Sequence, residues 1–256
     1  MDKYIIGIDS GSTYCKAVLF SEGNLIDKTI VKSGWQPEKI AMNVTDYLID
    51  NNNINKSTCK IITTGYGRES ITFAHKTLTE ITAHSLGGFY LEPEISGIID
   101  IGGQDSKVIK TKNGKVMNFH MNDKCAAGTG RFLDMACNTL DIPIDELDIF
   151  LNTKDFVHIN SMCTVFAESE IIGLMSASTP RELVINGVLR SIAIRIQGVL
   201  SKLQLQKNDI LLMTGGLSRS KKIVEIISEV TGFEVITNEK SPFAGAIGAA
   251  VSGIGE

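Results

Sequence analysis

Residues 4–20 read YIIGIDSGSTYCKAVLF, which is an apolar strand, a Gly-Ser-Thr turn and a second strand. Residues 97–110 read GIIDIGGQDSKVIK and have the same pattern. Both copies fit the ungapped motif D-x-G-x4-K-x6-G, which favours an internal duplication over two unrelated hairpins that both need glycine. The four identities lie 91 positions apart, in the pairs Asp9/Asp100, Gly11/Gly102, Lys16/Lys107 and Gly23/Gly114.

The segments that follow the two copies alternate between helical and strand patterns. Helices are expected at residues 40–48 and 183–203, and short buried strands at residues 60–64 and 210–214. The second helix has a continuous aliphatic stripe, which is typical of a core helix rather than a cofactor site. This alternation predicts an α/β fold of two units with mixed sheets. A Glu-Pro-Glu corner at residues 92–94 marks the boundary, so we expect the units at residues 1–95 and 96–256.

The composition excludes several classes of protein. The 256 residues are 43% hydrophobic and 21% charged, which suffices for an ordinary core, and the net charge is −4. No block of Lys and Arg suggests nucleic-acid binding, and no apolar stretch reaches the ~20 residues of a membrane span. The first residues carry Asp2, Lys3 and Asp9, unlike a signal peptide. Five scattered cysteines argue against a disulfide scaffold, so we expect a soluble cytoplasmic protein whose thiols are free, catalytic or metal-bound.

Both copies contain a glycine-rich turn that suits a phosphate group. Glycine has no Cβ, so backbone N–H groups there can approach a phosphate closely. The candidate phosphate-binding residues are Gly11, Ser12 and Thr13 in the first copy and Gly102, Gly103 and Gln104 in the second. One such turn is common, but two related by duplication could clamp one triphosphate between two units. The Walker pattern is absent from the sequence, so this is not a P-loop protein.

Charged and polar side chains beside these turns complete the candidate ATP site. Lys16 adds a positive charge near the phosphates. Asp9 and Asp100 end their strands just before the turns, where a carboxylate can hold Mg²⁺ directly or through its waters. Gln104 and Asp105 are placed to orient an attacking water. Asp100, Gln104 and Asp105 are therefore the candidate catalytic residues.

Two cysteines directly precede helical patterns. Cys125 comes before a helix expected over residues 132–140, and Cys163 before one expected over residues 165–174. Free backbone N–H groups and the positive end of the helix dipole stabilise a thiolate at such positions. Two thiolates are too few for a cubane iron–sulfur cluster, but a symmetric homodimer would supply four. The residues alone leave open whether these cysteines are ligands or buried thiols.

Three motifs resemble those of the actin, sugar-kinase and heat-shock ATPase superfamily. They are IDSGST at residues 8–13, IDIGG at residues 99–103 and TGG at residues 214–216. The resemblance implies two actin-like (ribonuclease-H-like) domains with mixed sheets flanked by helices, and a nucleotide in the interdomain cleft. It places adenosine at Gly215 and Gly216. The small residues near the end imply a last helix, at about 243–256, that packs back on the first domain.

Longer motifs resemble the activator component (component A) of 2-hydroxyacyl-CoA dehydratases, over essentially the whole chain. These motifs are NDKCAAGTGRFL at residues 122–133, CTVFAESE at 163–170, IDIGGQD at 99–105 and TGYGR at 64–68. The resemblance implies a homodimer with one [4Fe-4S] cluster, held by Cys125 and Cys163 of each subunit. ATP hydrolysis would then drive a low-potential electron to a partner dehydratase. An upstream ferredoxin or flavodoxin would supply that electron.

The resemblance also places Gly128, Thr129, Gly130 and Arg131 near the nucleotide, which would link the cluster helix to the phosphate site. Cys15, Cys59 and Cys137 match no ligand motif and are expected to be core or surface thiols. The four histidines, His75, His84, His120 and His158, lack metal spacing and are interpreted as structural. Three alternative functions stay open: an ATP-dependent reductase of a double-cubane-cluster protein, a small-molecule kinase without a cluster, and a nucleotide-gated scaffold.

Overall fold

Two five-stranded sheets of the same topology form the centre of the protein. The computed structural model describes residues 4–160 and 163–255. The first sheet has the order β3-β2-β1-β4-β5, with β1 (Tyr4–Ser10), β2 (Tyr14–Ser21), β3 (Asn24–Lys32), β4 (Cys59–Thr64) and β5 (Lys76–Thr77). The second has the order β8-β7-β6-β9-β10, with β6 (Gly97–Ile101), β7 (Ser106–Lys112), β8 (Lys115–Asn122), β9 (Ile210–Gly215) and β10 (Glu234–Ile236). In each sheet the first three strands of the chain pair antiparallel and the last two pair parallel, so the expected pair of mixed sheets is confirmed.

The strand register places the duplicated residues at equivalent positions. Asp9 of β1 faces Lys16 of β2, and Asp100 of β6 faces Lys107 of β7. Each aspartate lies near the end of its strand, next to the glycine-rich turn. The match in sequence is therefore also a match in position within the sheet, as a duplication predicts.

Helices cover both faces of the first sheet. Helix α1 (Pro37–Asn51) begins at a proline, whose fixed φ suits the first turn of a helix. It packs Val44 and Leu48 against Ile6 and Ile8 of β1. Because side chains alternate along a strand, Asp9 lies on the opposite face from Ile8.

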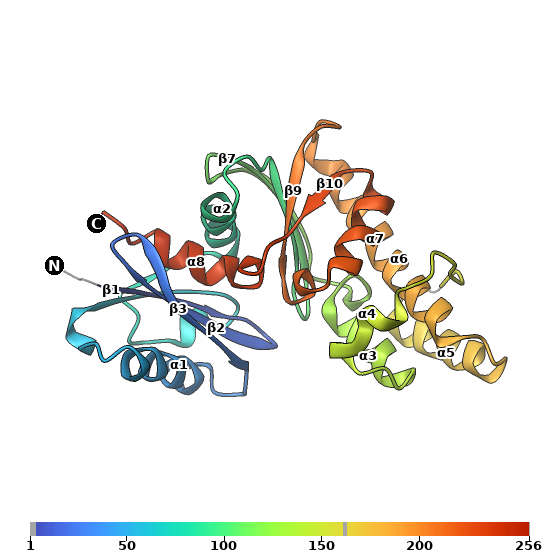
Figure 1. Ribbon diagram of the computed structural model, residues 1–256, viewed down its shortest axis with the longest axis horizontal. Coiled ribbons are helices and arrows are strands. Elements are labelled where there is room, and N and C mark those ends of the chain that lie inside the picture. Colours follow the sequence, from blue (N-terminus) through green and yellow to red (C-terminus); the bar gives the residue numbers. More distant parts are fainter. Residues whose placement is uncertain (1–3, 161–162, 256) are drawn as a thin grey trace.

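Helix α8 (Ala244–Val251) covers that opposite face. Its small side chains let it lie directly on β1, β2 and β4. Ala246 and Ile247 pack against Val18 and Phe20 of β2. The C-terminal helix therefore contacts the N-terminal sheet (Figure 1).

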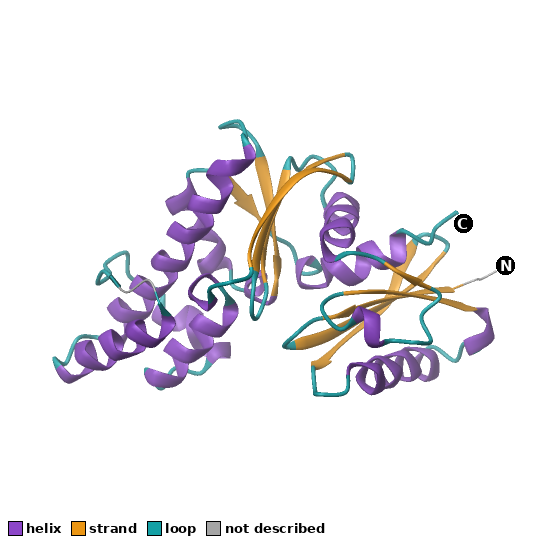
Figure 2. Cartoon of the chain, turned by 180° about the vertical axis from the view of Figure 1, so that it is seen from behind, coloured by secondary structure: helices purple, strands orange, loops and turns teal. Residues whose placement is uncertain are grey.

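Helices α2 (Glu80–Leu91) and α8 cross at very short range. A Cβ on Gly87 would lie 1.9 Å from the carbonyl oxygen of Ala244, and one on Gly248 would lie 1.7 Å from that of Ala83. No real side chain fits at either distance, so both positions require glycine. The two helices form the layer between the sheets, which Figure 2 shows from behind.

The outer face of α2 packs on the second sheet. Ile81 and Leu91 contact the cluster that contains Ile98 of β6 and Leu212 of β9. Helix α2 belongs to the segment that the sequence assigned to the first domain, yet it lies against the second sheet. A domain boundary near residue 95 therefore remains a prediction. Helix α2 contacts both the second sheet and α8, which covers the first sheet.

The other face of the second sheet carries a helical layer. It contains α3 (Gly130–Thr139), α4 (Leu147–Phe150), α5 (Thr164–Ser176), α6 (Arg181–Leu200) and α7 (Lys221–Thr231). In the described residues, short 3-10 turns lie at Lys56–Thr58, Arg68–Ser70, Ala126–Gly128, Ile144–Glu146, Ser201–Leu203, Gly216–Arg219 and Ser241–Phe243. Figure 1 shows α5 at the end of the molecule farthest from the first sheet.

Helix α6 is the core helix that its aliphatic stripe predicts. Val184, Val188, Ile192 and Ile196 are all buried. Together with the turn that follows it, α6 is long and apolar enough in composition to cross a membrane. However, 61% of its most apolar window is buried inside the protein, as expected of a core helix.

Candidate nucleotide site and cysteine pair

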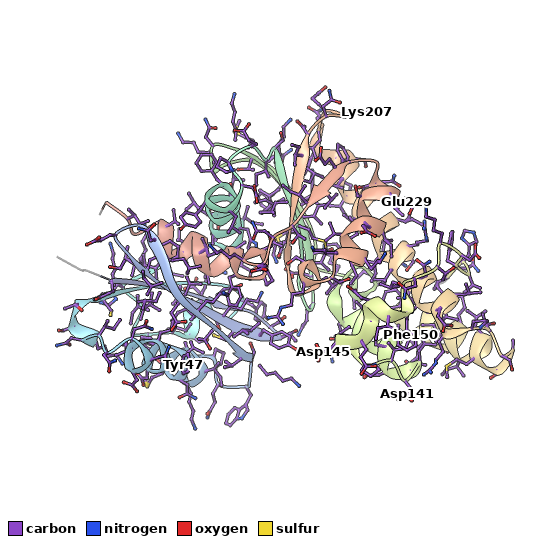
Figure 3. All side chains as sticks on the ribbon, viewed as in Figure 1. Tyr47, Asp141, Asp145, Phe150, Lys207 and Glu229 are labelled. Atoms are coloured by element: carbon purple, nitrogen blue, oxygen red, sulfur yellow. The ribbon has the colours of Figure 1, made fainter. Side chains whose placement is uncertain are left out.

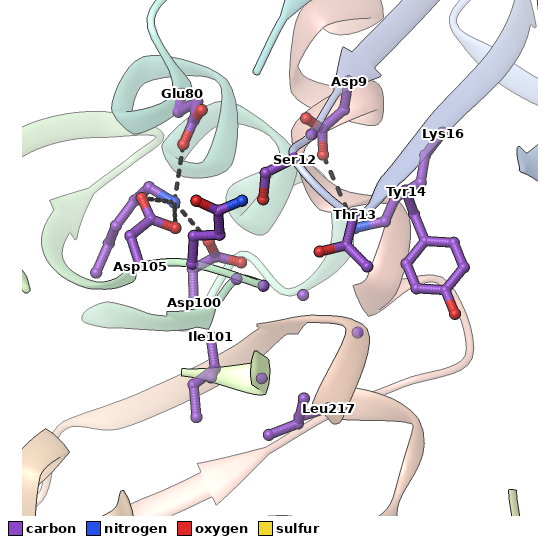
Figure 4. A pocket seen from close by; sticks show the side chains of 18 of the residues that line it. Asp9, Ser12, Thr13, Tyr14, Lys16, Glu80, Asp100, Ile101, Asp105 and Leu217 are labelled. Carbon is purple, nitrogen blue, oxygen red and sulfur yellow. Dashed lines mark hydrogen bonds and ion pairs between the residues drawn. The ribbon is translucent and has the colours of Figure 1, made fainter. Parts of the chain in front are cut away.

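A cleft of about 760 Å³ lies where the two glycine-rich turns meet, and this volume is typical of small-molecule sites (Figure 4). The three expected catalytic residues and most of the residues expected to bind nucleotide line it. They are Asp9, Gly11, Ser12, Thr13, Lys16, Asp100, Gly102, Gly103, Gln104, Asp105, Gly130, Gly215 and Gly216. Gly128, Thr129 and Arg131 were expected there but do not line the cleft.

The two turns touch each other across the cleft. A Cβ on Gly103 would lie 1.9 Å from Oγ1 of Thr13 and 3.3 Å from Oγ of Ser12. A side chain at position 103 would therefore displace the Thr13 hydroxyl and crowd the Cβ of Thr13, which would lie at 3.0 Å. The same absence of a Cβ leaves room for a phosphate group beside the turn.

Asp9 is a buried carboxylate whose negative charge is only weakly balanced by a nearby cation. Its side chain is 9% exposed, and the nearest cation is Nζ of Lys16 at 3.8 Å from Oδ2. Burial raises the pKa of Asp9, while Lys16 and His84 oppose that rise. A bound divalent cation would compensate this charge, so the donor set of Asp9 and Asp100 fits Mg²⁺.

Three carboxylates converge on one buried amine. Nζ of Lys107 lies 2.8 Å from Glu80, 3.1 Å from Asp100 and 3.0 Å from Asp105 (Figure 4). Burial alone would lower the pKa of Lys107, but Asp100, Glu80 and Asp105 raise it well above its usual value. Burial would likewise raise the pKa of Asp100, but His84 and Lys107 hold it well below the usual range. Lys107 and Asp100 are therefore both charged.

Of the two residues expected to orient water, Gln104 is the more available. It is exposed in the cleft, and within the described residues it makes no hydrogen bond. The carboxylate of Asp105 is engaged by Lys107, and burial raises the pKa of Asp105 despite that contact. Gln104 is therefore the better candidate for orienting the attacking water.

Apolar and acidic side chains also line the cleft. Leu133, Leu217 and Ile223 are apolar and would suit the flat faces of a nucleobase. Asp145 lies at the edge of the cleft, between the first sheet and the helical layer (Figure 3).

The second turn is hydrogen-bonded to the start of α3. The N–H of Gly130 donates to the carbonyl of Gly102 at 2.8 Å, and that of Arg131 donates to the carbonyl of Gly103 at 3.0 Å. Thr129 is fully buried and its hydroxyl donates to the carbonyl of Ala126, so it faces away from the cleft. The second turn and the helix start thus form one hydrogen-bonded unit.

The helix after Cys125 begins two residues before the expected range of 132–140, but it does not follow the cysteine directly. A 3-10 turn at Ala126–Gly128 follows the cysteine, and α3 begins only at Gly130. Thr129 between them is extended, with φ −129° and ψ 169°, which interrupts the helix. Cys163, in contrast, is the N-cap residue of α5.

Only two of the five cysteines are exposed, and they are the expected ligands Cys125 and Cys163. Burial raises the pKa of Cys15 and of Cys137 to about 12, so these thiols stay protonated and are poor ligands. Cys59 is also buried. Within the described part of the chain, no group of three or more His, Cys, Asp or Glu is suited to hold a metal ion. One chain therefore offers two accessible thiols, half of what a cubane needs.

Among the cleft residues that sequence reasoning did not assign to the site are Glu80, His84 and Lys107, which lie around Asp100. Lys107 had a usable signal, because it matches Lys16 in the duplication. Glu80 and His84 had none, since only the packing of α2 on the second sheet brings them to the site.

Two sheets of equal topology, with a cleft between two glycine-rich turns, define an ATPase of the actin-like class. More narrowly, the chain belongs to the BadF/BadG/BcrA/BcrD ATPase family, whose sequence model matches residues 6–253. YjiL of Escherichia coli is 40% identical over 251 residues, which are 98% of this chain and 96% of that protein. The (R)-2-hydroxyglutaryl-CoA dehydratase activating ATPase of Acidaminococcus fermentans is 37% identical over 98% of this chain and 97% of its own length.

Solved structures agree with this assignment. The crystal structure of component A of the Acidaminococcus fermentans dehydratase superposes with a TM-score of 0.91, covering 97% of this chain and 96% of that one. The activator of 2-hydroxyisocaproyl-CoA dehydratase from Clostridium difficile, with bound ADPNP, also gives 0.91, at 36% identity and with coverage of 97% and 93%. The expected actin-like fold and ATPase class are confirmed.

Replacing Asp9 by Asn should stabilise the nucleotide-free protein while abolishing ATP hydrolysis. The folded-state pKa of Asp9 is raised above the unfolded value of about 3.9. Asp9 thus contributes stability that is fully present below that unfolded pKa and is lost as pH rises through the folded pKa. Asparagine stays neutral, so the Tm advantage of Asp9→Asn should grow over this window and then level off. Thermal unfolding of both proteins between pH 4 and 8 measures this.

Asp27→Asn is the matched control with the opposite sign. Burial raises the pKa of Asp27, but hydrogen bonds from Asn52 and Asn51, both at 2.8 Å, together with Lys28, lower it overall. Its contribution to stability is present above the unfolded pKa and is lost as pH falls through the folded pKa. Asp27→Asn should therefore be less stable than wild type at neutral pH. If Asp9→Asn also lost stability at neutral pH, the buried charge of Asp9 would not be destabilising, which would contradict the raised pKa of Asp9.

Proposed function

We propose that this protein is an ATP-dependent electron-transfer activator. It hydrolyses ATP to drive one low-potential electron from a [4Fe-4S] cluster to a partner enzyme of the 2-hydroxyacyl-CoA dehydratase type. The observation that carries the proposal is the hydrogen-bonded unit between the second turn and α3, because it joins the phosphate site to the segment that bears Cys125. Relatives at 37% identity over nearly the full chain are named as dehydratase activators.

The nucleotide site divides its tasks among the cleft residues. The turns at residues 11–13 and 102–104 hold the phosphates, and Gly215 and Gly216 hold adenosine. Asp9 and Asp100 would hold Mg²⁺, which supplies positive charge to the phosphate oxygens. Gln104 orients the attacking water.

The cluster would lie between two copies of the chain. Cys125 and Cys163 are exposed, as ligands shared across a two-fold axis need to be before assembly. Close to Cys163 in the chain, the apolar residues Val165 and Phe166 are 67% and 69% exposed, which favours a contact with a second copy at this end. A ferredoxin or flavodoxin would reduce the cluster, and the protein would act in the cytoplasm.

The backbone hydrogen bonds between the second turn and α3 would couple nucleotide binding to the position of Cys125. The carbonyls of Gly102 and Gly103 accept hydrogen bonds from the first two residues of α3. A shift of the second turn on nucleotide binding therefore moves the start of α3 and, five residues earlier, Cys125. Nucleotide biases the conformation only to the extent that it binds one state better than the other.

Nucleotide should change the accessibility of the cluster without any partner enzyme. The measurement is the rate at which bathophenanthroline strips iron from anaerobically reduced protein with no nucleotide, ADP or ATP, together with the EPR spectrum in each state. We expect different stripping rates and spectra, since both depend on solvent exposure and on hydrogen bonds to sulfur. Gln104→Ala should hold the ATP-state rate for longer, because hydrolysis is slowed.

A kinase with an incidental cluster has no reason to behave in this way. Identical rates and spectra in every nucleotide state would refute the coupling, even if iron and ATPase activity were both present.

A further inference from the structure

His84 is a buried residue of the cleft that the proposed ATPase chemistry does not use. Its residue exposure is 4%, and it lies on α2 against the end of the second sheet. Its Nδ1 is 3.1 Å from Oγ1 of Thr214 and 3.6 Å from Oδ1 of Asp100. The imidazole therefore faces the carboxylate of Asp100, near the end of β6.

The donors and acceptors of this contact can be assigned. The Thr214 hydroxyl donates its one proton to Oδ1 of Asp100 at 2.9 Å, because an ionised carboxylate only accepts. The oxygen of Thr214 must then accept, so Nδ1 of His84 carries a proton and donates it. The other oxygen of Asp100, Oδ2, accepts from Lys107 at 3.1 Å. Both oxygens of Asp100 are thus held in fixed positions.

Side chains of helix α2 contact Lys107 and Thr214, the two residues that hydrogen-bond to Asp100. Glu80 and His84 are one helical turn apart and so lie on one face of α2. Glu80 contacts Lys107 at 2.8 Å, while His84 contacts Thr214. The same helix therefore fixes the residue on each side of the carboxylate.

The opposite edge of the imidazole faces the first sheet. A Cβ on Gly245 of α8 would lie 3.0 Å from Nε2 of His84 and 2.9 Å from Oδ2 of Asp9. His84 thus lies between the strand ends that carry Asp9 and Asp100, the two carboxylates that suit a divalent cation.

We propose that His84 is a positioning residue for the divalent cation of the nucleotide site. Through Thr214 it orients Asp100, and so it sets the affinity for the metal rather than that for the nucleotide. The proposal rests on the proposed function of a Mg²⁺-dependent ATPase. Partners of this kind, once removed, weaken metal binding about 10–100-fold.

The test compares two amides that place their nitrogen differently. In His84→Asn the amide nitrogen can occupy the Nδ1 position, whereas in His84→Gln it reaches toward Nε2. The full-length protein is titrated with MgCl₂ at saturating ATP, and Mn²⁺ binding to the ADP-bound protein is followed by EPR. We expect His84→Gln and His84→Ala to raise the half-saturating metal concentration about 10–100-fold. His84→Asn should stay within about 3-fold, and ADP affinity in EDTA should change by less than about 3-fold in all three variants.

Variants of Thr214 test the same contact from the other side. Thr214→Ser keeps the hydroxyl and should resemble wild type, whereas Thr214→Val should match His84→Ala. The double variant His84→Ala/Thr214→Val should be no worse than either single one, because both remove one chain of hydrogen bonds. If His84→Ala does not fold, the Thr214 variants still test whether the hydrogen bond between His84 and Thr214 sets the metal affinity.

Two outcomes would overturn the role of His84: an unchanged metal requirement in His84→Ala and Thr214→Val, or equal impairment of His84→Asn and His84→Gln. A wild-type protein whose nucleotide turnover ignores Mg²⁺ and Mn²⁺ would overturn the metal-dependent ATPase itself, and the positioning role with it.

Discussion

Anaerobically purified protein should be a brown dimer with about four irons per dimer, and replacing either Cys125 or Cys163 by serine should remove the colour. These are the only two exposed cysteines among the described residues, and each directly precedes a helical segment. Serine is a far weaker ligand than thiolate, and each single change removes two of the four ligands of a shared cluster. Iron and acid-labile sulfide analysis measures the loss directly.

Cys59→Ser is the matched control for these variants. Cys59 is buried in the first sheet, and its sulfur lies 3.6 Å from the carbonyl of Asn55, a contact that a serine hydroxyl can keep. This variant should retain colour and iron. A full iron complement in the double variant of Cys125 and Cys163 would show that the ligands lie elsewhere.

Changes at neighbouring positions of the second turn should separate ATP binding from ATP hydrolysis. Gln104→Ala should leave the Kd for ATP within about 3-fold of wild type, because the exposed side chain makes no contact that holds the turn. It should slow hydrolysis about 100-fold, since a group that orients water acts mainly in the transition state. Gly103→Val should instead abolish binding, because its Cβ would collide with Thr13 across the cleft.

Gly198→Ala controls for the general effect of adding a side chain. Gly198 is exposed on α6, and a Cβ there would meet no atom within 4 Å. The variant should bind and hydrolyse ATP normally and be slightly more stable, since alanine is favoured over glycine in helices by up to about 1 kcal/mol. Nucleotide binding and steady-state hydrolysis are measured for all three variants. Equal loss of binding in Gln104→Ala and Gly103→Val would contradict the division of roles.

Local patterns in the sequence were enough for the sheets and the turns. A buried strand, a glycine-rich turn and a second strand are set by residues close together in the chain, and the repeat at 97–110 predicted the second sheet. The stripe over residues 183–203 predicted α6 for the same reason, because helical periodicity is local. Their positions before helices singled out Cys125 and Cys163, but only the family resemblance made them predicted cluster ligands.

The expectation for residues 128–131 shows what a motif resemblance does not specify. The resemblance placed all four near the nucleotide, but only Gly130 lines the cleft. The extended backbone at Thr129 and the bond from its hydroxyl to Ala126 turn the preceding residues away. Gly130 and Arg131 instead contribute backbone N–H groups that hold the second turn. Such a role cannot be seen in a motif, because it depends on backbone direction rather than on residue type.

By itself, the sequence determined the two duplicated sheets and the glycine-rich turn that each of them carries. The tertiary structure alone decided that α2 brings Glu80 and His84 to the second sheet. His84 is 130 residues from Thr214, and Thr214 is 114 residues from Asp100. No local pattern specifies contacts over such separations. They exist because α2 must bury one face on the second sheet and the other on α8, where only glycine allows the backbones to meet.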